Sequence, residues 1–352
     1  AQKQHTRRYS AAVSRFRTIN GQSRAEANVQ AQRATLIGFE QSLLLQAATA
    51  YMAVVRDEAV LELNKNNEQV LRRQLEATQD RFRVGEITRT DVSQAEARVS
   101  GAMADRIQAE GALQISKSSY VNVIGQPPGQ LTSPKSLEAL PKSLEEAKGI
   151  AKKGHPDIIS AQFREQSARE AVKVKRGELY PTLNAVGTAS RAWESSTNDS
   201  QLTTGEVRLD LSIPLYQKGT VYSQLRESKV AAGRSRLDLE DARRTVLANV
   251  SSAWETLTST RARIKSFEAQ IKAADIALEG VQREASVGSR TVLDVLDAEQ
   301  ELLDAKVSLV RAQRDEIVAS FQLKEAVGQL TAENLSLQVD LFDPDAYYRH
   351  KK

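Results

Sequence analysis

The sequence predicts a mainly α-helical protein in which one long helical hairpin occurs twice, with a β-hairpin between the two copies. Three observations predict this fold class: the positions of the prolines, an internal repeat, and one alternating apolar pattern. Seven of the eight prolines lie between positions 127 and 214, and the eighth is Pro344. Ala1 to Gln126 and Leu215 to Asp343 therefore lack proline, the residue that interrupts helices most strongly.

Long helices are expected over Gln22 to Arg83 and Thr220 to Ser286, where glycine is scarce and strong helix formers dominate. At a rise of about 1.5 Å per residue, each would span roughly 90–100 Å, so each must pack along other helices. Their apolar positions are mainly Ala, Leu and Val at steps of three and four residues, which is typical of a coiled-coil seam. Aromatic residues make up only 5% of the chain, which agrees with long helices rather than a thick globular core.

An internal repeat relates the two helical regions. The matching positions share one offset of 203 and include Val84-Gly85 with Val287-Gly288, Thr88 with Thr291, Asp91-Val92 with Asp294-Val295, Ala95-Glu96 with Ala298-Glu299, Gly125-Gln126 with Gly328-Gln329, and Tyr51 with Trp254. A single register held from Tyr51 to Gln126 indicates a structural duplication.

Each copy contains a tight reversal. Gly85 and Gly288 stand where a helix should stop, because glycine readily adopts the left-handed conformation of a helix C-terminus. Three residues later, Thr88 or Thr291 can cap the next helix, with an aspartate at its third position completing a capping box. We therefore expect return helices over Thr88 to Ile124 and Thr291 to Val327.

The region between the two copies combines a connector, a helix and strands. A break at Gln126 to Gly129 opens a connector over 128–156, and a helix expected over 157–180 would stack end-to-end on the first return helix. A β-hairpin follows over 181–217, with a weakly alternating strand from Leu183 to Trp193 and a polar loop over 194–204. Its second strand alternates over ten residues, about the length of a transmembrane strand. The apolar positions of this strand are Val207, Leu209, Leu211, Ile213 and Leu215. A half-buried hairpin of a soluble protein explains the strand pattern equally well.

Composition and motifs exclude several functions. The net charge is +4 with basic and acidic residues interleaved, so we expect no nucleic-acid partner. His5, His155 and His350 are scattered without metal-ligand spacing, and no phosphate-binding glycine loop is present, so we expect neither metal, cofactor nor enzymatic activity. The absence of cysteine suits an exported protein, and no apolar run approaches the ~20 residues of a membrane helix. No signal peptide is present, so an exported protein would be in its mature form.

Several segments resemble the TolC-like outer-membrane efflux protein family. They are Arg81 to Gly85 with Thr90-Asp91-Val92, Val287 to Ala298, Ser212 to Tyr216 followed by Gly219, Phe16-Arg17-Thr18, and Ala25-Glu26-Ala27. The match spans nearly the whole chain and includes the duplication.

The resemblance implies a homotrimer in the bacterial outer membrane. Its helical hairpins, over 18–127 and 218–328, would form an α-barrel tunnel across the periplasm, with the connector and the C-terminal segment 329–352 around its equator. Its strands would contribute to one β-barrel in outer-membrane lipid. The implied partners are a periplasmic adaptor (membrane fusion) protein and an inner-membrane RND or ABC transporter, for drug efflux or type I secretion.

One departure from the family concerns the first strands, because each family subunit supplies four strands to the barrel. Here no counterpart of Asp157 to Trp193 precedes residue 1, and Arg8 to Phe16 could make at most one irregular strand. We therefore expect a degenerate or truncated first β segment over 1–17, and an incomplete first β-hairpin.

Charged residues at the hairpin tips are the candidate pore site. Asp294 and Asp297 lie three apart on one helix face, and in a trimer they would form stacked carboxylate rings that favour cations and bind metal ions. For Asp294 and Asp91, a capping role explains the residue as well as a pore role does. The resemblance assigns Asp294 and Asp297 to the constriction and Arg290 to a network that keeps the tunnel shut, in which Ala285 replaces a tyrosine of some members. We expect gating by outward movement of the second hairpin.

The turns themselves are the candidate docking site for the adaptor. The residues concerned are Val84, Gly85, Glu86, Val287, Gly288 and Ser289. Simple turn geometry is the alternative explanation, and both can hold together.

A soluble coiled-coil scaffold or membrane-shaping dimer is the alternative function. It explains the Ala-rich helices, but it explains neither the alternating strand nor why a β-hairpin interrupts a duplication.

Overall fold

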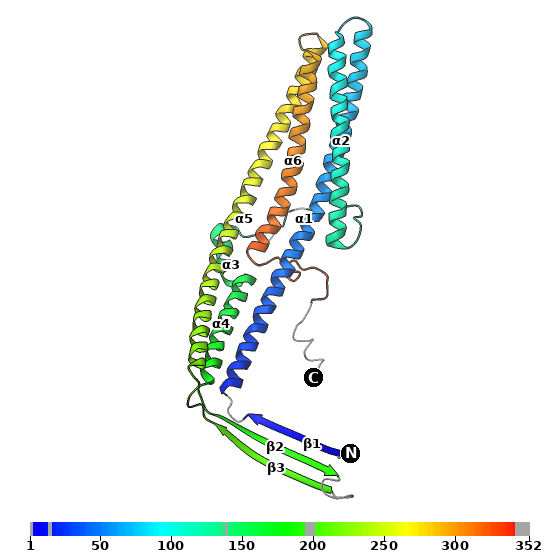
Figure 1. Ribbon diagram of the computed structural model, residues 1–352. Helices are drawn as coiled ribbons and strands as arrows, with labels where there is room; N and C mark the ends of the chain where they lie inside the picture. Colours follow the sequence, from blue (N-terminus) through cyan, green and yellow to red (C-terminus); the bar gives the residue numbers. More distant parts are fainter. Residues whose placement is uncertain (1–2, 13–15, 135, 138–139, 194–200, 342–352) are drawn as a thin grey trace. The chain divides into compact units, whose positions relative to one another are not determined.

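The computed structural model describes residues 3–12, 16–134, 136–137, 140–193 and 201–341. Within these residues it contains six helices and three strands (Figure 1). The chain divides into two compact units: residues 1–37 with 156–245, and residues 38–155 with 246–352. The helices α1 (Phe16–Arg83) and α5 (Thr220–Ser286) contribute to both units. The predicted fold class, mainly α with a β-hairpin, is confirmed.

The first unit contains an antiparallel sheet in the order β1-β2-β3. Its strands are β1 (Lys3–Ala12), β2 (Thr182–Trp193) and β3 (Gln201–Ser212). As expected, a single strand represents the first β-hairpin among the described residues, but its predicted bounds, Arg8 to Phe16, and its irregularity are wrong. Strand β1 pairs continuously with β2 from Lys3 opposite Trp193 to Ala12 opposite Asn184. The sequence of β1 is polar on both faces, so pairing with a neighbour, rather than a burial pattern, defines this strand.

Strand β3 is shifted towards the N-terminus of the chain relative to the prediction. It begins at Gln201 and ends at Ser212, so the expected polar loop is wrong over 201–204, while 194–200 lie outside the described residues. Ile213 and Leu215 therefore follow the strand rather than belonging to it. The strand ends there because its partner begins at Thr182, after Pro181, and because Pro214 has no N–H group to donate.

The two faces of β3 differ in chemistry. Val207, Leu209 and Leu211 share one face and are 87%, 67% and 62% exposed. On the other face, Arg208 makes ion pairs with Glu206 and Asp210. The apolar face predicted from the alternation is therefore present over these three residues, and it has no partner within the described part of the chain.

Helix α4 (Pro156–Gly177) packs along the first part of α1 within this unit. The hydroxyl oxygens of Thr35 and Ser160 lie 3.0 Å apart in a hydrogen bond. At the other end of the contact, the Phe16 ring meets the Tyr180 ring edge to face, with centroids 5.3 Å apart. The helix expected over 157–180 thus ends at Gly177, where a Cβ atom would lie 2.7 Å from Cγ of Arg17.

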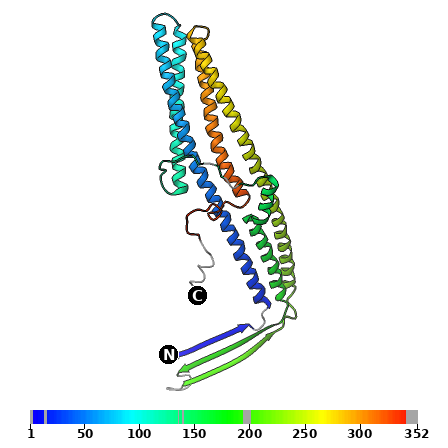
Figure 2. The same ribbon diagram turned by 180° about the vertical axis from the view of Figure 1, so that it is seen from behind.

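The second unit contains the two hairpins. The first hairpin is the end of α1 with α2 (Arg89–Ile124), and the second is the end of α5 with α6 (Val292–Ala326). These helices lie side by side with both turns at the same end of the unit, as the two views show (Figures 1 and 2). The predicted helices of Thr220 to Ser286, Thr88 to Ile124 and Thr291 to Val327 agree with these bounds. The first long helix begins at Phe16, earlier than Gln22.

Helix α3 (Leu144–Gly154) was not predicted, since it lies inside the expected connector. Its N-terminus is capped, with the Glu146 N–H donating to Ser143 Oγ at 3.2 Å and the Lys142 N–H donating to the Glu146 carboxylate at 2.8 Å. This Ser-x-x-Glu capping pattern was a usable signal in the sequence. Its buried face is made by Ala147 and Ala151.

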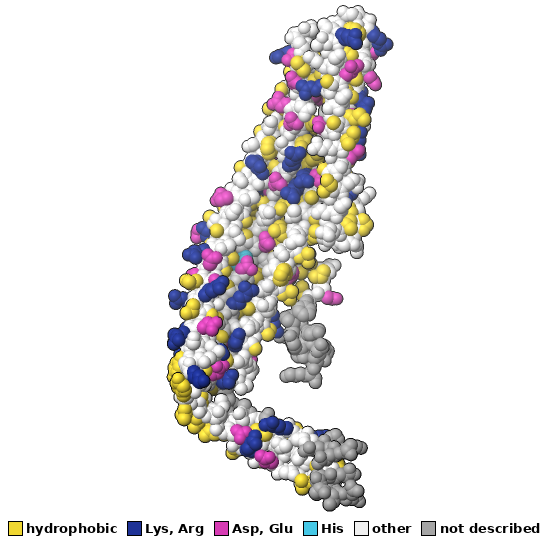
Figure 3. Space-filling view, viewed as in Figure 1, with side chains coloured by type: hydrophobic (Ala, Val, Ile, Leu, Met, Phe, Trp, Pro, Cys, Tyr) yellow, Lys and Arg dark blue, Asp and Glu magenta, His cyan; other side chains and the backbone are white. Residues whose placement is uncertain are grey.

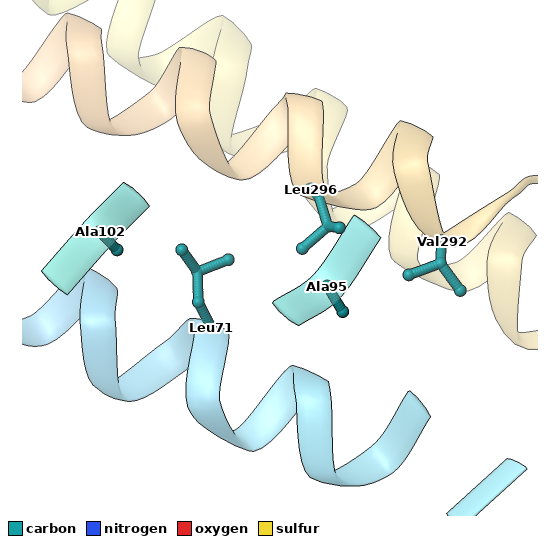
Figure 4. Packing of buried hydrophobic residues seen from close by; sticks show 5 residues of the cluster. All are labelled: Leu71, Ala95, Ala102, Val292 and Leu296. Atoms are coloured by element: carbon teal, nitrogen blue, oxygen red, sulfur yellow. The ribbon is translucent and has the colours of Figure 1, made fainter. Parts of the chain in front are cut away.

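The core of the second unit is a set of small clusters along the helices. One cluster joins the hairpins near their turns: Leu71 of α1, Ala95 and Ala102 of α2, and Val292 and Leu296 of α6 (Figure 4). Other clusters lie within one hairpin, such as Val54, Leu61, Ala109 and Leu113 in the first. Alanines at the contacts let the helices approach closely, so a chain poor in aromatic residues still buries apolar side chains between its helices.

An ion pair between α1 and α2 helps to fix how the two helices of the first hairpin align. The buried Glu68 carboxylate accepts a hydrogen bond from Arg106 Nε of α2 at 2.6 Å and a second from Arg72 of its own helix. The bonds from Arg72 and Arg106 lower the pKa of Glu68. On the face shown in Figure 3, basic and acidic side chains are interspersed along the helices, as the sequence indicates. Among the described residues, none of the helices combines the length and the apolar character needed to cross a membrane.

Candidate functional site

The two hairpin turns have the same backbone geometry. Gly85 and Gly288 both have φ of 79°. In each turn the next residue donates its N–H to the carbonyl five residues back, Glu86 to Arg81 and Ser289 to Glu284, at 3.0 Å each. This hydrogen bond and the left-handed glycine define a Schellman C-cap, so the predicted role of glycine in these turns is confirmed.

Both return helices begin with a complete capping box. The Thr88 N–H donates to Asp91 Oδ2 at 2.8 Å, and the Thr291 N–H donates to Asp294 Oδ2 at 2.9 Å. In return, each aspartate N–H donates to the threonine hydroxyl. The Thr88 hydroxyl lowers the pKa of Asp91, and the Thr291 backbone N–H lowers the pKa of Asp294. Both aspartates therefore cap a helix, and both stay ionised at neutral pH.

An ion pair crosses each turn, with opposite polarity in the two copies. In the first turn, Arg81 on the helix pairs with Glu86 in the turn at 2.6 Å. In the second, Glu284 on the helix pairs with Arg290 in the turn at 2.9 Å. Arg290 is therefore tied to its own turn in this chain, and Glu284 raises the pKa of Arg290. Sequence reasoning missed Glu284, although opposite charges flanking a glycine turn were a signal for it.

Exposed valines accompany the two glycines. Val84 is 79% exposed and Val287 is 80% exposed, although both are apolar. The two turns that contain these valines lie at the same end of the second unit (Figure 2). The use of these turns for docking remains a prediction.

Asp297 is placed differently from Asp294. Its carboxylate is ion-paired with the guanidinium of Arg98 on α2, so it joins the second hairpin to the first. Arg98 is 199 positions away in the sequence, and no local spacing identified it. Among the predicted pore residues, Asp294 and Arg290 thus lie at the second turn, and Asp297 lies between the two hairpins. Asp91 caps α2 in the first hairpin.

Replacing Gly288 by Ala is expected to destabilise the second turn by about 1–2 kcal/mol, because a residue with a Cβ pays that cost in the left-handed region. No atom beyond the adjacent residues lies within 4 Å of the Cβ position, so backbone strain rather than crowding is the cause. Hydrogen exchange of the amides over 284–292 should become faster. Gly280→Ala is the matched control, since Gly280 is helical with equally open space and should exchange more slowly. Unchanged exchange in G288A would contradict the role assigned to this glycine.

The described residues contain no group of three or more His, Cys, Asp or Glu side chains that could hold a metal ion. The acidic side chains at the turns are each engaged singly, in a cap or an ion pair. Within one chain the site therefore consists of two capped, ion-paired turns and one salt bridge between hairpins.

The chain is similar to known proteins over nearly its whole length. The model of the family described as "Outer membrane efflux protein" matches residues 15–126 and 149–329. The outer membrane efflux protein BepC of Brucella suis is 36% identical over 338 residues, which are 96% of this chain and 74% of that protein. The outer membrane protein TolC of Vibrio cholerae is 28% identical over 306 residues, covering 84% of this chain and 70% of that protein.

Solved structures share the fold. The crystal structure of the outer membrane protein VceC from Vibrio cholerae superposes with a TM-score of 0.79 at 18% identity, covering 93% of this chain and 87% of that chain. The resemblance inferred from the turns and the duplication is thus confirmed. This chain belongs to the outer membrane efflux protein family, a family of channel proteins, and its location is the bacterial outer membrane, with a helical portion in the periplasm.

Proposed function

We propose that this chain is the exit duct of a tripartite drug efflux pump or type I secretion system, and that three copies assemble into one passive conduit. Membership of a channel family supports this function over the soluble scaffold. The single observation that carries it is the pair of matched turns, each with a rigid left-handed glycine and an exposed valine. The apolar face of β3, formed by Val207, Leu209 and Leu211, suits contact with outer-membrane lipid.

The turns would dock a periplasmic adaptor protein. Val84, Gly85 and Glu86 form the first contact surface, and Val287, Gly288 and Ser289 form the second. Because the sequence contains no phosphate-binding glycine loop, an inner-membrane transporter of the RND or ABC class would supply the energy. Efflux is named in the relative BepC, and this similarity supports an efflux system first.

The gate would lie at the start of α6. Asp294 and Asp297 are one helical turn apart, so three copies of each around an axis would give two levels of carboxylates. Outward movement of the second hairpin would open the conduit. The cluster of Leu71, Ala95, Ala102, Val292 and Leu296 is small, and this supports a seam that can part without unfolding either hairpin.

Membrane fractionation and bilayer recording test the proposal. The protein should occur in the outer membrane as a trimer that dissociates only on heating, and the purified trimer should give discrete conductance steps in a planar bilayer. Cells lacking the protein should lose resistance to exported compounds or lose secretion. A soluble dimer without conductance would contradict the duct and favour the scaffold.

A further inference from the structure

One face of α2 lies in the contact between the two hairpins. Ala95, Arg98 and Ala102 follow one another at steps of three and four residues, so they lie on the same helix face. The two alanines are 1% and 5% exposed and belong to one buried cluster with Leu71 of α1 and with Val292 and Leu296 of α6 (Figure 4). The long cationic side chain of Arg98 lies between these two small residues on the same helix face.

Asp297 of α6 contacts the Arg98 side chain. It directly follows Leu296, which is 1% exposed, and its carboxylate pairs with the Arg98 guanidinium. The side chains are 36% exposed for Arg98 and 57% exposed for Asp297. The pair therefore lies at the solvent border of the seam, where a carboxylate can reach either the arginine or an ion in water.

The pair breaks the internal duplication. With the offset of 203, the counterpart of Asp297 is Gln94 and the counterpart of Arg98 is Glu301, so the equivalent contact would not join opposite charges. The ion pairs of the two turns are different in kind, because Arg81 with Glu86 and Arg290 with Glu284 each lie within one hairpin. Arg98 is thus placed to act between hairpins.

We infer that Arg98 masks the charge of Asp297 while the hairpins are in contact, so that the conduit gains this carboxylate only when the hairpins separate. The inference rests on the proposed function, since it concerns the charge that passing ions meet. Separating α6 from α2 breaks the ion pair and leaves Asp297 free to bind a cation. By linkage, a cation that binds the freed carboxylate favours the separated state by its difference in affinity for the two states.

The expected size of the effect follows from the exposure of the pair. Partly exposed ion pairs change an equilibrium by a factor of up to about five, so removing Arg98 should raise the cation-to-anion permeability ratio about two- to fivefold. Arg98 therefore adjusts selectivity and does not hold the conduit shut alone. The sign of the change separates masking from a purely structural role, because a loosened seam would lower discrimination between ions.

The test compares Arg98→Gln, Asp297→Asn and the double variant in single-channel recordings of the trimer. We expect R98Q to raise the cation-to-anion permeability ratio, D297N to lower it, and the double variant to match D297N apart from a general charge effect. Arg283→Gln measures that general effect, since Arg283 pairs with Glu279 within α5 near the same turn. Arg98→Lys keeps the charge and should behave like the wild type.

The outcomes distinguish failure of the masking role from failure of the duct. If R98Q raises the ratio equally with and without Asp297, or no more than R283Q does, the masking role is wrong while the duct stands. If D297N leaves the ratio of a conducting trimer unchanged, Asp297 does not face the conduit, and both the pore assignment and the masking role are wrong. Should R98Q fail to assemble, the charge exchange R98D/D297R restores the pair and should lower the cation-to-anion ratio below that of the wild type, because the residue exposed on separation is then cationic; an unchanged or higher ratio would contradict the masking role.

Discussion

Val84→Asp combined with Val287→Asp is expected to abolish export while the trimer still reaches the outer membrane. Both valines are highly exposed in turns whose backbone is fixed by glycine, so an aspartate there disturbs no packing within the chain. In a docked complex each new carboxylate would lie in an apolar contact without a partner. Burying an unpaired charge costs several kcal/mol, and about 1.4 kcal/mol already weakens binding tenfold. The affinity for the adaptor should therefore fall more than tenfold.

Co-purification of the adaptor and the susceptibility of cells to exported compounds measure the effect. Val84→Thr with Val287→Thr is the matched control, because threonine keeps the shape and the β-branch without adding charge, and it should retain most export. Either single aspartate variant should have an intermediate effect if both turns dock. Normal adaptor binding by the double aspartate variant would leave these valines as turn residues only.

The helices and turns were predictable because several local signals agreed in two copies. A left-handed glycine, a capping threonine and an aspartate three residues later recur at 85–91 and 288–294. Each signal alone is weak, but the fixed register excludes coincidence. Helix α5, bounded by Gly219 and the turn at Gly288, was accordingly predicted with both of its ends.

The sheet was harder to predict for a physical reason. Strand β1 has arginine, tyrosine, serine and alanine side chains without alternation, and only its pairing with β2 defines it. Similarly, β3 ends where its partner ends rather than where the apolar alternation ends, so Ile213 and Leu215 were wrongly included. Strand bounds depend on a neighbour that can be far away in the sequence, whereas helix caps are local.

Part of the candidate site could not be predicted, because it also depends on contacts between residues far apart in the sequence. Asp294 could be identified with its cap, because Thr291 is three residues away. The partner of Asp297 could not, because the contact with Arg98 depends on how α2 packs against α6. The sequence predicted which residues carry charge at the turns, while the structure was needed to tell which charges are already paired.

Asp294→Asn with Asp297→Asn is expected to lower the preference for cations by about tenfold at low ionic strength, since clustered like charges raise the local counter-ion concentration by that order or more. Asparagine is chosen because its side-chain oxygen can still accept the Thr291 N–H, so the cap of α6 survives while the charge is lost. Reversal potentials in a salt gradient measure the change. The difference should shrink as salt is raised, because ions screen exposed charges.

The double variant is compared with a control variant elsewhere on α6 and with the single variant D294N. Asp304→Asn removes one carboxylate further along α6, where Asp304 accepts a hydrogen bond from Gln300, and it should change selectivity far less. D294N alone should have the larger single effect, because Asp297 is shared with Arg98 whereas Asp294 keeps its full charge beside a cap that lowers its pKa. If the double variant conducts with unchanged selectivity, both aspartates serve only the helix and the seam. The constriction must then be sought at other residues.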